Sequence, residues 1–462
     1  MIFNSTVFLY LFLPITWLVF RSLRNRSHRH VWLTITGYVF YAAWNYRFCA
    51  LMALSTAVSY TAGLGFLRWQ DPRRRRLCLV LPITFDLALL GVFKYADFAL
   101  GSVRNLAAAF GVPLDVPTLA IVLPVGISFY TFHTITYIVD SYRRTIVPTR
   151  DFFEFSCYVS LFSQLVAGPI VRFRQIEGDL DHIDRPADPE MWTRGWSFFA
   201  IGMIKKVLIA DTLAACVNPA LAHWTALSTA GAWLAALGYT YQLYFDFSGY
   251  SDMAVGLGLL FGLRLPQNFN SPYQAVDIAD FWRRWHISLS TVLRDYLYIP
   301  LGGNRRGRVR TYANIMTTML LGGLWHGANW TFVCWGGYHG VLLGLTRLAG
   351  RRLERVPVGL RRAVTFLLVV VGWVLFRSRD FGMAAGLLRR MFGWRAGAAP
   401  EGWPLLLGVL LVAAAVSHWS RNSFEMSHRW GRAGTVALAA LFALCLAFIY
   451  AGQNAPFLYF QF

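Results

Sequence analysis

The chain has 462 residues, of which 56% are hydrophobic and only 14% are charged. A soluble protein of this length would lack the polar surface needed to cover its core, so the composition excludes a soluble fold and predicts a membrane protein. The formal net charge of +20 could indicate nucleic-acid binding, but the arginines form short clusters between apolar stretches instead of one basic face. Membrane topology explains such clusters, and we expect membrane lipid as a partner and no nucleic acid.

Apolar stretches of spanning or near-spanning length recur along the chain, with no linker that would separate domains. The first, residues 7–20, is followed by basic residues and preceded by none, which is the reverse of a secretory signal peptide. The others lie at about 31–46, 48–67, 77–103, 119–139, 155–171, 196–217, 231–263, 311–348, 363–376, 403–418 and 434–451. They predict an all-α, polytopic integral membrane protein with about 11–13 transmembrane or re-entrant helices, and residues 1–462 in a single domain.

Basic clusters mark the expected cytoplasmic side of the membrane. If clusters such as Arg21–Arg29, Arg68–Arg76 and Arg283–Arg310 are cytoplasmic, the chain crosses back and forth with both ends outside. The cluster from Arg377 to Arg395 does not fit this scheme. Either one helix is counted wrongly, or these arginines meet an anionic partner outside, and the sequence leaves both alternatives open.

The cysteines indicate neither metal nor redox chemistry. They lie scattered in apolar segments, without the CxxC spacing of zinc and redox sites. We expect them to be small hydrophobic residues, and we expect no metal site. The six cysteines are Cys49, Cys78, Cys157, Cys216, Cys334 and Cys445.

Acidic residues occur inside the apolar stretch YQLYFDFSGYSDMAVGLG, residues 241–258. Asp246 and Asp252 are costly at membrane depth, and an ionisable residue there indicates a functional site by default. The alternative is that both carboxylates pair with arginines of the next loop and hold the fold. Glycines in the same stretch permit a broken or closely packed helix.

The segment DFWRRWHISLSTVLRDY, residues 280–296, has the pattern of one amphipathic helix. At about 100° per residue its polar residues, His286 among them, share a face about 120° wide, opposite the aromatic and aliphatic residues. Such a helix lies at the cytoplasmic interface, where one interpretation is lipid anchoring alone. The other is a site for a phosphate-rich donor such as acetyl-CoA, because guanidinium groups bind phosphates. The residues expected to bind it are Arg283, Arg284 and Arg294, with Asn304 and Arg305 of the following turn LGGNRRGR.

Two histidines lie in the Gly- and Trp-rich stretch LLGGLWHGANWTFVCWGGYHG, residues 320–340. A lone histidine in an apolar helix is usually a hydrogen-bonded structural residue. His326 has two further features, because glycines beside it allow close approach and the arginine-rich segment precedes it. A neutral imidazole there can take the proton of a hydroxyl that attacks a thioester carbonyl. His339 lies in a similar setting with less support.

Three strings, YFDFSGYSDMAVGLG, DFWRRWHISLSTVLRDYLYIPLGGNR and LLGGLWHGANW, closely resemble the membrane-bound O-acyltransferase superfamily, in the branch that contains the membrane subunit of bacterial alginate O-acetyltransferase. The similarity covers nearly the whole chain, including MIFNSTVF at its start and APFLYFQF at its end. It implies a ring of helices around a central funnel, a catalytic role for His326 and a donor made in the cytoplasm. It also implies a separate extracytoplasmic acetyltransferase or acyl-accepting partner protein.

These patterns together predict an O-acetyltransferase of the bacterial cytoplasmic (inner) membrane. We expect it to move acetyl from acetyl-CoA to an exopolysaccharide hydroxyl, with alginate as the best single choice. The same motifs would serve acetylation of cellulose, peptidoglycan or another glycan and, less closely, D-alanyl transfer to teichoic acid. A transporter or channel is the alternative of a different class, but it should show internal symmetry or paired broken helices, and neither is visible.

The C-terminal string APFLYFQF follows the last apolar stretch and carries no charged side chain. Its aromatic residues, with Tyr459 among them, are typical of an interfacial belt. An uncharged tail can also fold back into a protein funnel, since it brings no ion that must lose its water. In that case the Tyr459 hydroxyl could accept the acetyl group, with His326 as base, and pass it outward.

Overall fold

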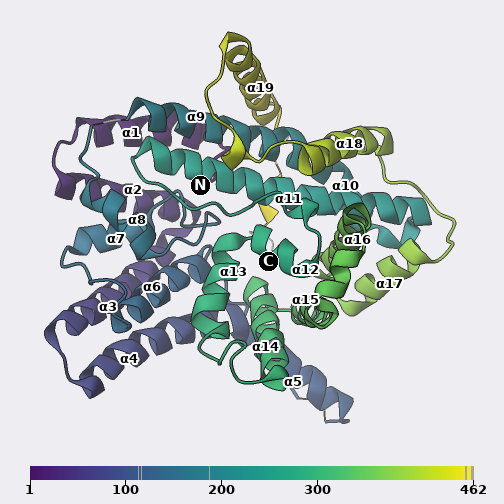
Figure 1. The fold of residues 1–462 in the computed structure, drawn as a ribbon, viewed down its shortest axis with the longest axis horizontal. Coiled ribbons are helices and arrows are strands. Elements are labelled where there is room, and N and C mark those ends of the chain that lie inside the picture. The colour runs from purple at the N-terminus through teal and green to yellow at the C-terminus, as the bar shows by residue number, and fades with distance from the viewer. Residues whose placement is uncertain (113, 116, 187, 453–454, 459–462) are drawn as a thin grey trace. The chain divides into compact units, whose positions relative to one another are not determined.

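The computed structural model describes residues 1–462 except 113, 116, 187, 453–454 and 459–462. The regular elements of this described part are helices, and it contains no strand beyond one isolated bridge between Leu227 and Ala398 (Figure 1). The all-α prediction is therefore confirmed. The residues group into two compact units, Met1–Met191 with Gly258–Leu265, and Trp192–Leu257 with Pro266–Phe462. A single domain over residues 1–462 remains a prediction.

The first unit follows the apolar stretches near the N-terminus. Two predicted stretches are helical only in part, because α6 begins at Ile127 and α7 ends at Ser160. After α7, residues 161–172 are buried although their backbone is irregular, which a membrane protein tolerates where protein surrounds that backbone. The helices are η1 (Phe8–Phe12), α1 (Leu13–Ser22), α2 (Arg26–Asn45), η2 (Tyr46–Phe48), α3 (Cys49–Arg68), α4 (Pro72–Leu90), η3 (Gly91–Tyr95), α5 (Ala96–Ala109), α6 (Ile127–Tyr142), α7 (Phe152–Ser160) and α8 (Phe173–Asp181).

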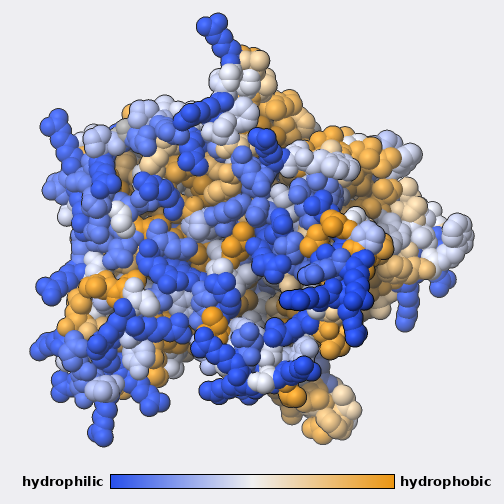
Figure 2. Space-filling view, viewed as in Figure 1, coloured by the Kyte–Doolittle hydropathy of each residue, from blue (hydrophilic) through white to orange (hydrophobic). Residues whose placement is uncertain are grey.

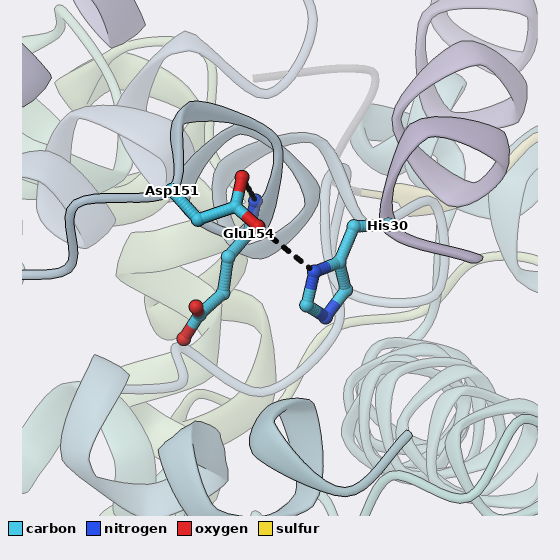
Figure 3. Close-up of side chains that lie close together, drawn as sticks. All are labelled: His30, Asp151 and Glu154. Carbon is cyan, nitrogen blue, oxygen red and sulfur yellow. Dashed lines mark hydrogen bonds and ion pairs between the residues drawn. The ribbon is translucent and has the colours of Figure 1, made fainter. Parts of the chain in front are cut away.

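A polar cluster ties α2 to α7 and α8 within this unit (Figure 3). The Nε2 atom of His30 lies 3.1 Å from the Leu180 carbonyl oxygen, and its Nδ1 atom faces the Asp151 carboxylate at 3.8 Å. His30, Asp151 and Glu154 are the one group with the spacing of metal ligands among the described residues. The Arg26 guanidinium already pairs with Glu154 at 2.8 Å, so ion pairing between helices explains the cluster.

The second unit contains the helices from α9 onward, among them the 32-residue helix α11. The predicted stretch 231–263 forms one unbroken helix, α11, whereas the stretch 311–348 forms two helices, α14 and α15, that lie side by side (Figure 1). The helices are α9 (Pro189–Met203), η4 (Ile204–Asp211), α10 (Thr212–Ala222), η5 (Trp224–Ala226), α11 (Thr229–Leu260), η6 (Pro272–Gln274), α12 (Ile278–Arg284), α13 (Ile287–Leu293), η7 (Arg294–Tyr298), α14 (Arg308–His326), α15 (Trp330–Ala349), η8 (Gly350–Arg355), α16 (Val358–Arg377), α17 (Phe381–Phe392), α18 (Trp403–Trp419), η9 (Ser423–Glu425) and α19 (Arg432–Tyr450).

Several helices have the length and surface of membrane helices. Within the described residues, four helical stretches are long and apolar enough to cross a membrane, namely Arg26–Arg68, Pro72–Ala109, Val358–Arg377 and Arg432–Tyr450. Hydrophobic side chains gather on the surfaces of α5, α18 and α19 (Figure 2). Exposed apolar surface of this extent is unfavourable in water and is what lipid covers. The chain is therefore an integral membrane protein.

Candidate active site

The helix pair α14 and α15 positions His326, the last residue of α14. The two helices pack backbone against backbone, since a Cβ atom on Gly323 would collide with the Phe332 carbonyl group. A Cβ atom on Gly336 of α15 would collide with the backbone of α14 in the same way. These glycines provide the close approach that the sequence indicates, and the approaching group is the neighbouring helix.

Aromatic rings surround His326 inside the second unit. Its side chain is buried, and the centroid of its ring lies 5.0 Å from that of Trp325, 5.2 Å from that of Trp335 and 5.3 Å from that of Phe376. Trp335 and Phe376 meet the imidazole edge to face, at 88° and 76°. Close packing on several sides holds the imidazole in one orientation.

A cavity of about 200 Å³ reaches His326. Its wall comes from α12, α13, η7, α14 and α15, and most of it is apolar, with Leu289, Leu293 and Met319 as examples. Arg294 also lines the cavity and its side chain is 59% exposed, whereas His326 is buried. The cavity therefore joins the protein surface to the buried imidazole. An apolar cavity with a cation outside and an imidazole inside suits an elongated ligand with an anionic end.

The segment 280–296 is not the single amphipathic helix that its sequence predicts. It divides into α12, which ends at Arg284, and α13, which begins at Ile287. The break falls at His286, whose φ of 43° is a left-handed conformation that residues with a side chain rarely adopt. Trp285 is buried against Trp373 and does not face lipid. The helical period fails here because a break rotates every following residue to another face.

Asn268 orients His286, which is fully buried. The Oδ1 atom of Asn268 lies 3.2 Å from the backbone nitrogen of Ser288, and a backbone N–H can only donate, so this atom is the amide oxygen. The same oxygen lies 3.2 Å from Nδ1 of His286, which must therefore carry the ring proton. In the neutral ring, Nε2 is then an acceptor. The His286 and His326 ring centroids are 6.4 Å apart, so the two imidazole rings are neighbours.

Arg294 is the residue of the expected donor site that shares the cavity with His326. Its guanidinium lies 2.6 Å from the Asp295 carboxylate. This hydrogen bond raises the pKa of Arg294, because it stabilises the charged form. Arg294 is thus a permanent cation at the exposed part of the cavity.

The other four expected donor residues do not line this cavity. Arg283 and Arg284 pair with Asp280 of the same helix, at 3.5 and 3.0 Å. Asn304 and Arg305 are exposed in the turn that precedes α14. The structure therefore places one of the five expected donor residues at the cavity, and the other four do not line it.

His339 is fully buried in α15, behind Trp335. The Trp335 centroid lies 5.2 Å from that of His326 and 5.0 Å from that of His339. Within the described residues, neither ring nitrogen of His339 has a hydrogen-bond partner. His339 does not line the cavity, and a Cβ atom on Gly372 of α16 would lie 3.0 Å from its Nε2 atom. The two histidines are therefore separated by an indole ring.

The acids of α11 pair with lysines and not with arginines of the next loop. The Nζ atom of Lys205 lies 2.6 Å from the Asp252 carboxylate, and that of Lys206 lies 2.6 Å from the Asp246 carboxylate. Both lysines belong to η4, which is a π-helix, and π-helical turns are frequent at functional sites. Helix α11 is closely packed there, because a Cβ atom on Gly249 would lie 2.8 Å from a backbone oxygen of α9.

Tyr459 lies outside the described residues, but the chain before it is described as far as Leu458, which is buried. Lys206 and Asn268 contact candidate residues of the sequence analysis, Asp246 and His286, but the sequence patterns did not bring them forward. Lys206 is an ionisable residue inside the apolar stretch 196–217, so the rule that selected Asp246 would have found it as well. Asn268 has no such signal, because its importance depends on contacts with His286 and Ser288.

Comparisons with known proteins show the family of this chain. The chain matches the model of the MBOAT, membrane-bound O-acyltransferase family, over residues 119–377. It is 46% identical to a probable alginate O-acetylase of Pseudomonas aeruginosa, over 85% of this chain and 75% of that protein. It is 42% identical to a probable alginate O-acetylase of Pseudomonas putida over the full length of both. It is 36% identical to a peptidoglycan O-acetyltransferase of Helicobacter pylori, over 85% of this chain and 80% of that protein.

The resemblance seen in the sequence strings is thereby confirmed. Relatives named as O-acetylases or an O-acetyltransferase align along most of the chain, which favours an acyltransferase over a transporter or channel. The family match also spans both the arginine-rich segment and the α14–α15 helix pair that line the cavity. The chain belongs to the membrane-bound O-acyltransferase family and is a membrane acyltransferase.

Proposed function

We propose that this enzyme transfers acetyl from acetyl-CoA to an exopolysaccharide hydroxyl, with alginate as the first choice, across a bacterial cytoplasmic membrane. The observation that carries the proposal is the apolar cavity that joins exposed Arg294 to buried His326. The choice of acetyl and of alginate rests on relatives named as probable alginate O-acetylases, which align over 85% and 100% of this chain.

His326 is the general base of the proposed reaction. It takes the proton of the attacking hydroxyl, whose oxygen bonds to the thioester carbonyl carbon. The tetrahedral intermediate then breaks its carbon–sulfur bond, and the thiolate recovers the proton from His326. An ester and free coenzyme A are the products. No metal enters the scheme.

The donor enters the cavity with its phosphates outside and its acetyl thioester at His326. We assign Arg294 to the phosphates first, since it lines the cavity and a guanidinium binds phosphate in a forked geometry. Arg283, Arg284, Asn304 and Arg305 complete the proposed donor site. Arg284 contributes least, because Asp280 and the Asn270 carbonyl oxygen already engage its guanidinium.

The acetyl group leaves the cavity by way of the C-terminal tail. In this scheme the Tyr459 hydroxyl is the first acceptor, and an extracytoplasmic acetyltransferase or another acyl-accepting partner protein takes the group from the tyrosine ester to the polysaccharide. His339 acts through Trp335, whose ring it supports against His326. Its loss should therefore lower the rate less than the loss of His326.

A different glycan is the second candidate acceptor. The Helicobacter pylori relative named as a peptidoglycan O-acetyltransferase aligns over 85% of this chain, with an identity of 36%. That identity is lower than the 46% and 42% of the alginate relatives, which is why alginate stands first. Offering alginate and peptidoglycan separately to membranes that contain the enzyme and its partner decides between the two acceptors.

Replacement of His326 tests the proposed base. His326→Ala should reduce transfer of labelled acetyl from acetyl-CoA in membrane vesicles by about 10²- to 10⁴-fold, the usual cost of losing a general base. His223→Ala is the matched control, because His223 is exposed and lies outside the cavity. If His326→Ala retains more than a tenth of the activity at an equal amount of folded protein, His326 is structural and the scheme is wrong.

A further inference from the structure

Backbone atoms of the C-terminal tail complete a buried cluster of charges in the second unit. Lys206, Asp211 and Asp246 are each at most 5% exposed. The Lys206 ammonium lies 2.7 Å from the Asp211 carboxylate and 2.6 Å from the Asp246 carboxylate. It also donates to the carbonyl oxygen of Ala455 at 3.1 Å, and the other Asp246 oxygen accepts from the Leu458 N–H at 2.8 Å.

Counting donors explains why the tail belongs to this cluster. An ammonium group has three N–H donors, and Lys206 donates to the Asp211 carboxylate and to the tail carbonyl while it forms an ion pair with Asp246. Without the tail, one of its donors and one oxygen of Asp246 would lose their partners. Buried charges are tolerated only when such partners are in place, so the cluster favours a bound tail.

A ring contact sets the register of the tail. Phe457 is buried and stacks on Tyr250 of α11, with ring centroids 4.7 Å apart at 29°. It also lies 6.0 Å from Phe247, whose ring is 4.7 Å from that of His286. The hydrogen bonds to the tail involve backbone atoms and so do not depend on which side chains the tail carries. The Phe457 ring therefore determines that Ala455 and Leu458 are the residues that form these hydrogen bonds.

We propose that Lys206 and Asp246 form a tail clamp that holds residues 455–458 of the C-terminal tail against α11. The clamp rests on the proposed function in so far as its purpose is to deliver the tail to the acetyl group. Ring contacts lead from Phe457 through Phe247 and His286 to His326, so three successive ring contacts connect the clamped segment with the proposed base. Lys206 and Asp246 are positioning residues, because they touch the tail and not the donor cavity.

The chain offers a matched control one residue away. Lys205 pairs with Asp252 at 2.6 Å, and the second Asp252 oxygen accepts from the Ser423 hydroxyl at 2.9 Å. This pair joins the same two helices, η4 and α11, and its hydrogen bonds are to Ser423 and within the pair, not to the described residues of the tail. Loss of either pair should loosen the helices to a similar degree, but loss of the clamp alone should release the tail.

Accessibility of the tail is the measurement. In the full-length protein, with its six native cysteines changed to alanine, Leu458→Cys places a thiol at a residue that is 2% exposed. Lys206→Met should raise the rate of labelling by a water-soluble maleimide at least tenfold, and Lys205→Met should leave it unchanged. If Lys206→Met leaves the thiol protected, or if Lys205→Met exposes it equally, the clamp is wrong.

A second pair of variants serves if Lys206→Met does not fold. Asp246→Asn keeps the shape of the side chain, and Lys206 keeps its contact with Asp211. Labelling should still rise in Asp246→Asn and not in Asp252→Asn, and equal rates in the two would overturn the proposal.

Tyr459→Phe separates the clamp from the relay. If Tyr459→Phe keeps full activity and Lys206→Met exposes the thiol at position 458, the relay is rejected and the clamp stands. If Tyr459→Phe is inactive and the thiol stays protected in Lys206→Met, only the clamp is rejected.

Discussion

Two adjacent glycines of α14 test how the helix pair holds His326. A Cβ atom on Gly323 would collide with the backbone carbonyl of Phe332 in α15, which cannot move aside without moving the helix. A Cβ atom on Gly322 would meet only the end of the Leu293 side chain, at 3.1 Å, and that side chain can rotate. The same chemical change, glycine to alanine, should therefore have opposite consequences at the two positions.

The expected magnitudes follow from these contacts. Alanine is favoured over glycine inside a helix by about 1 kcal/mol, so Gly322→Ala should keep or slightly raise the free energy of unfolding. Overpacking at Gly323 should lower it by about 1–3 kcal/mol. The two helices would have to separate by roughly 1 Å, and a displacement of that size at a reacting group costs up to about 10²-fold in rate. His326 follows Gly323 by one turn of the same helix, so it moves with the helix.

Thermal unfolding in detergent and acetyl transfer per amount of folded protein measure the two effects. Gly322→Ala also narrows the cavity, which Gly322 lines, so its KM for acetyl-CoA should rise modestly while its stability holds. Equal stability and equal activity of Gly323→Ala and wild type would refute the close backbone contact, and with it the account of how His326 is positioned.

The remaining predictions concern the donor, the second histidine and the tail. Arg294→Lys keeps the charge but loses the forked geometry, so the KM for acetyl-CoA should rise several-fold with little change in kcat, and an unchanged KM would remove Arg294 from the donor site. Asn268→Asp places a carboxylate beside the Nδ1–H of His286, and this negative charge favours the protonated form of the ring. If His286 exchanges protons in the reaction, the acid limb of the pH–activity profile should therefore move to higher pH. Ser288→Ala, which loses a hydrogen bond to the same amide oxygen, is its control and should leave the profile in place. Tyr459→Phe should abolish polymer acetylation at a normal amount of membrane protein, and full activity would end the relay.

The charged pairs between η4 and α11 illustrate how a membrane enzyme uses ions that it must keep buried. Pairing Asp246 and Asp252 with adjacent lysines offsets part of the cost of burying their charges. One pair is completed by protein side chains, since Asp252 accepts from Ser423. The other is completed by the backbone of the tail. The same ionic device can therefore stabilise the packing of two helices in one place and bind the backbone of the C-terminal tail in another.

The sequence alone was sufficient for the class of the protein, its membrane location and its proposed base. Apolar stretches of membrane length predict helices because no other element satisfies its backbone within lipid, and this rule depends on no distant contact. His326 could be singled out because a polar group is rare in such a stretch and glycines flank it. The family that three sequence strings indicated is also the family of the relatives that align over most of the chain.

Only the tertiary structure decided which residues meet. The period of residues 280–296 predicts one helix, but a left-handed residue at His286 breaks it, because burial against Phe247 and a hydrogen bond to Asn268 outweigh local helix preference. The sequence also did not show the partners of Asp246 and Asp252. The arginines of the next loop are nearer in sequence, but the acids pair with Lys205 and Lys206 because η4 faces α11 where a glycine allows close packing. Periodicity describes one element at a time, whereas a site is made where several elements converge, and that convergence is a property of the packed core.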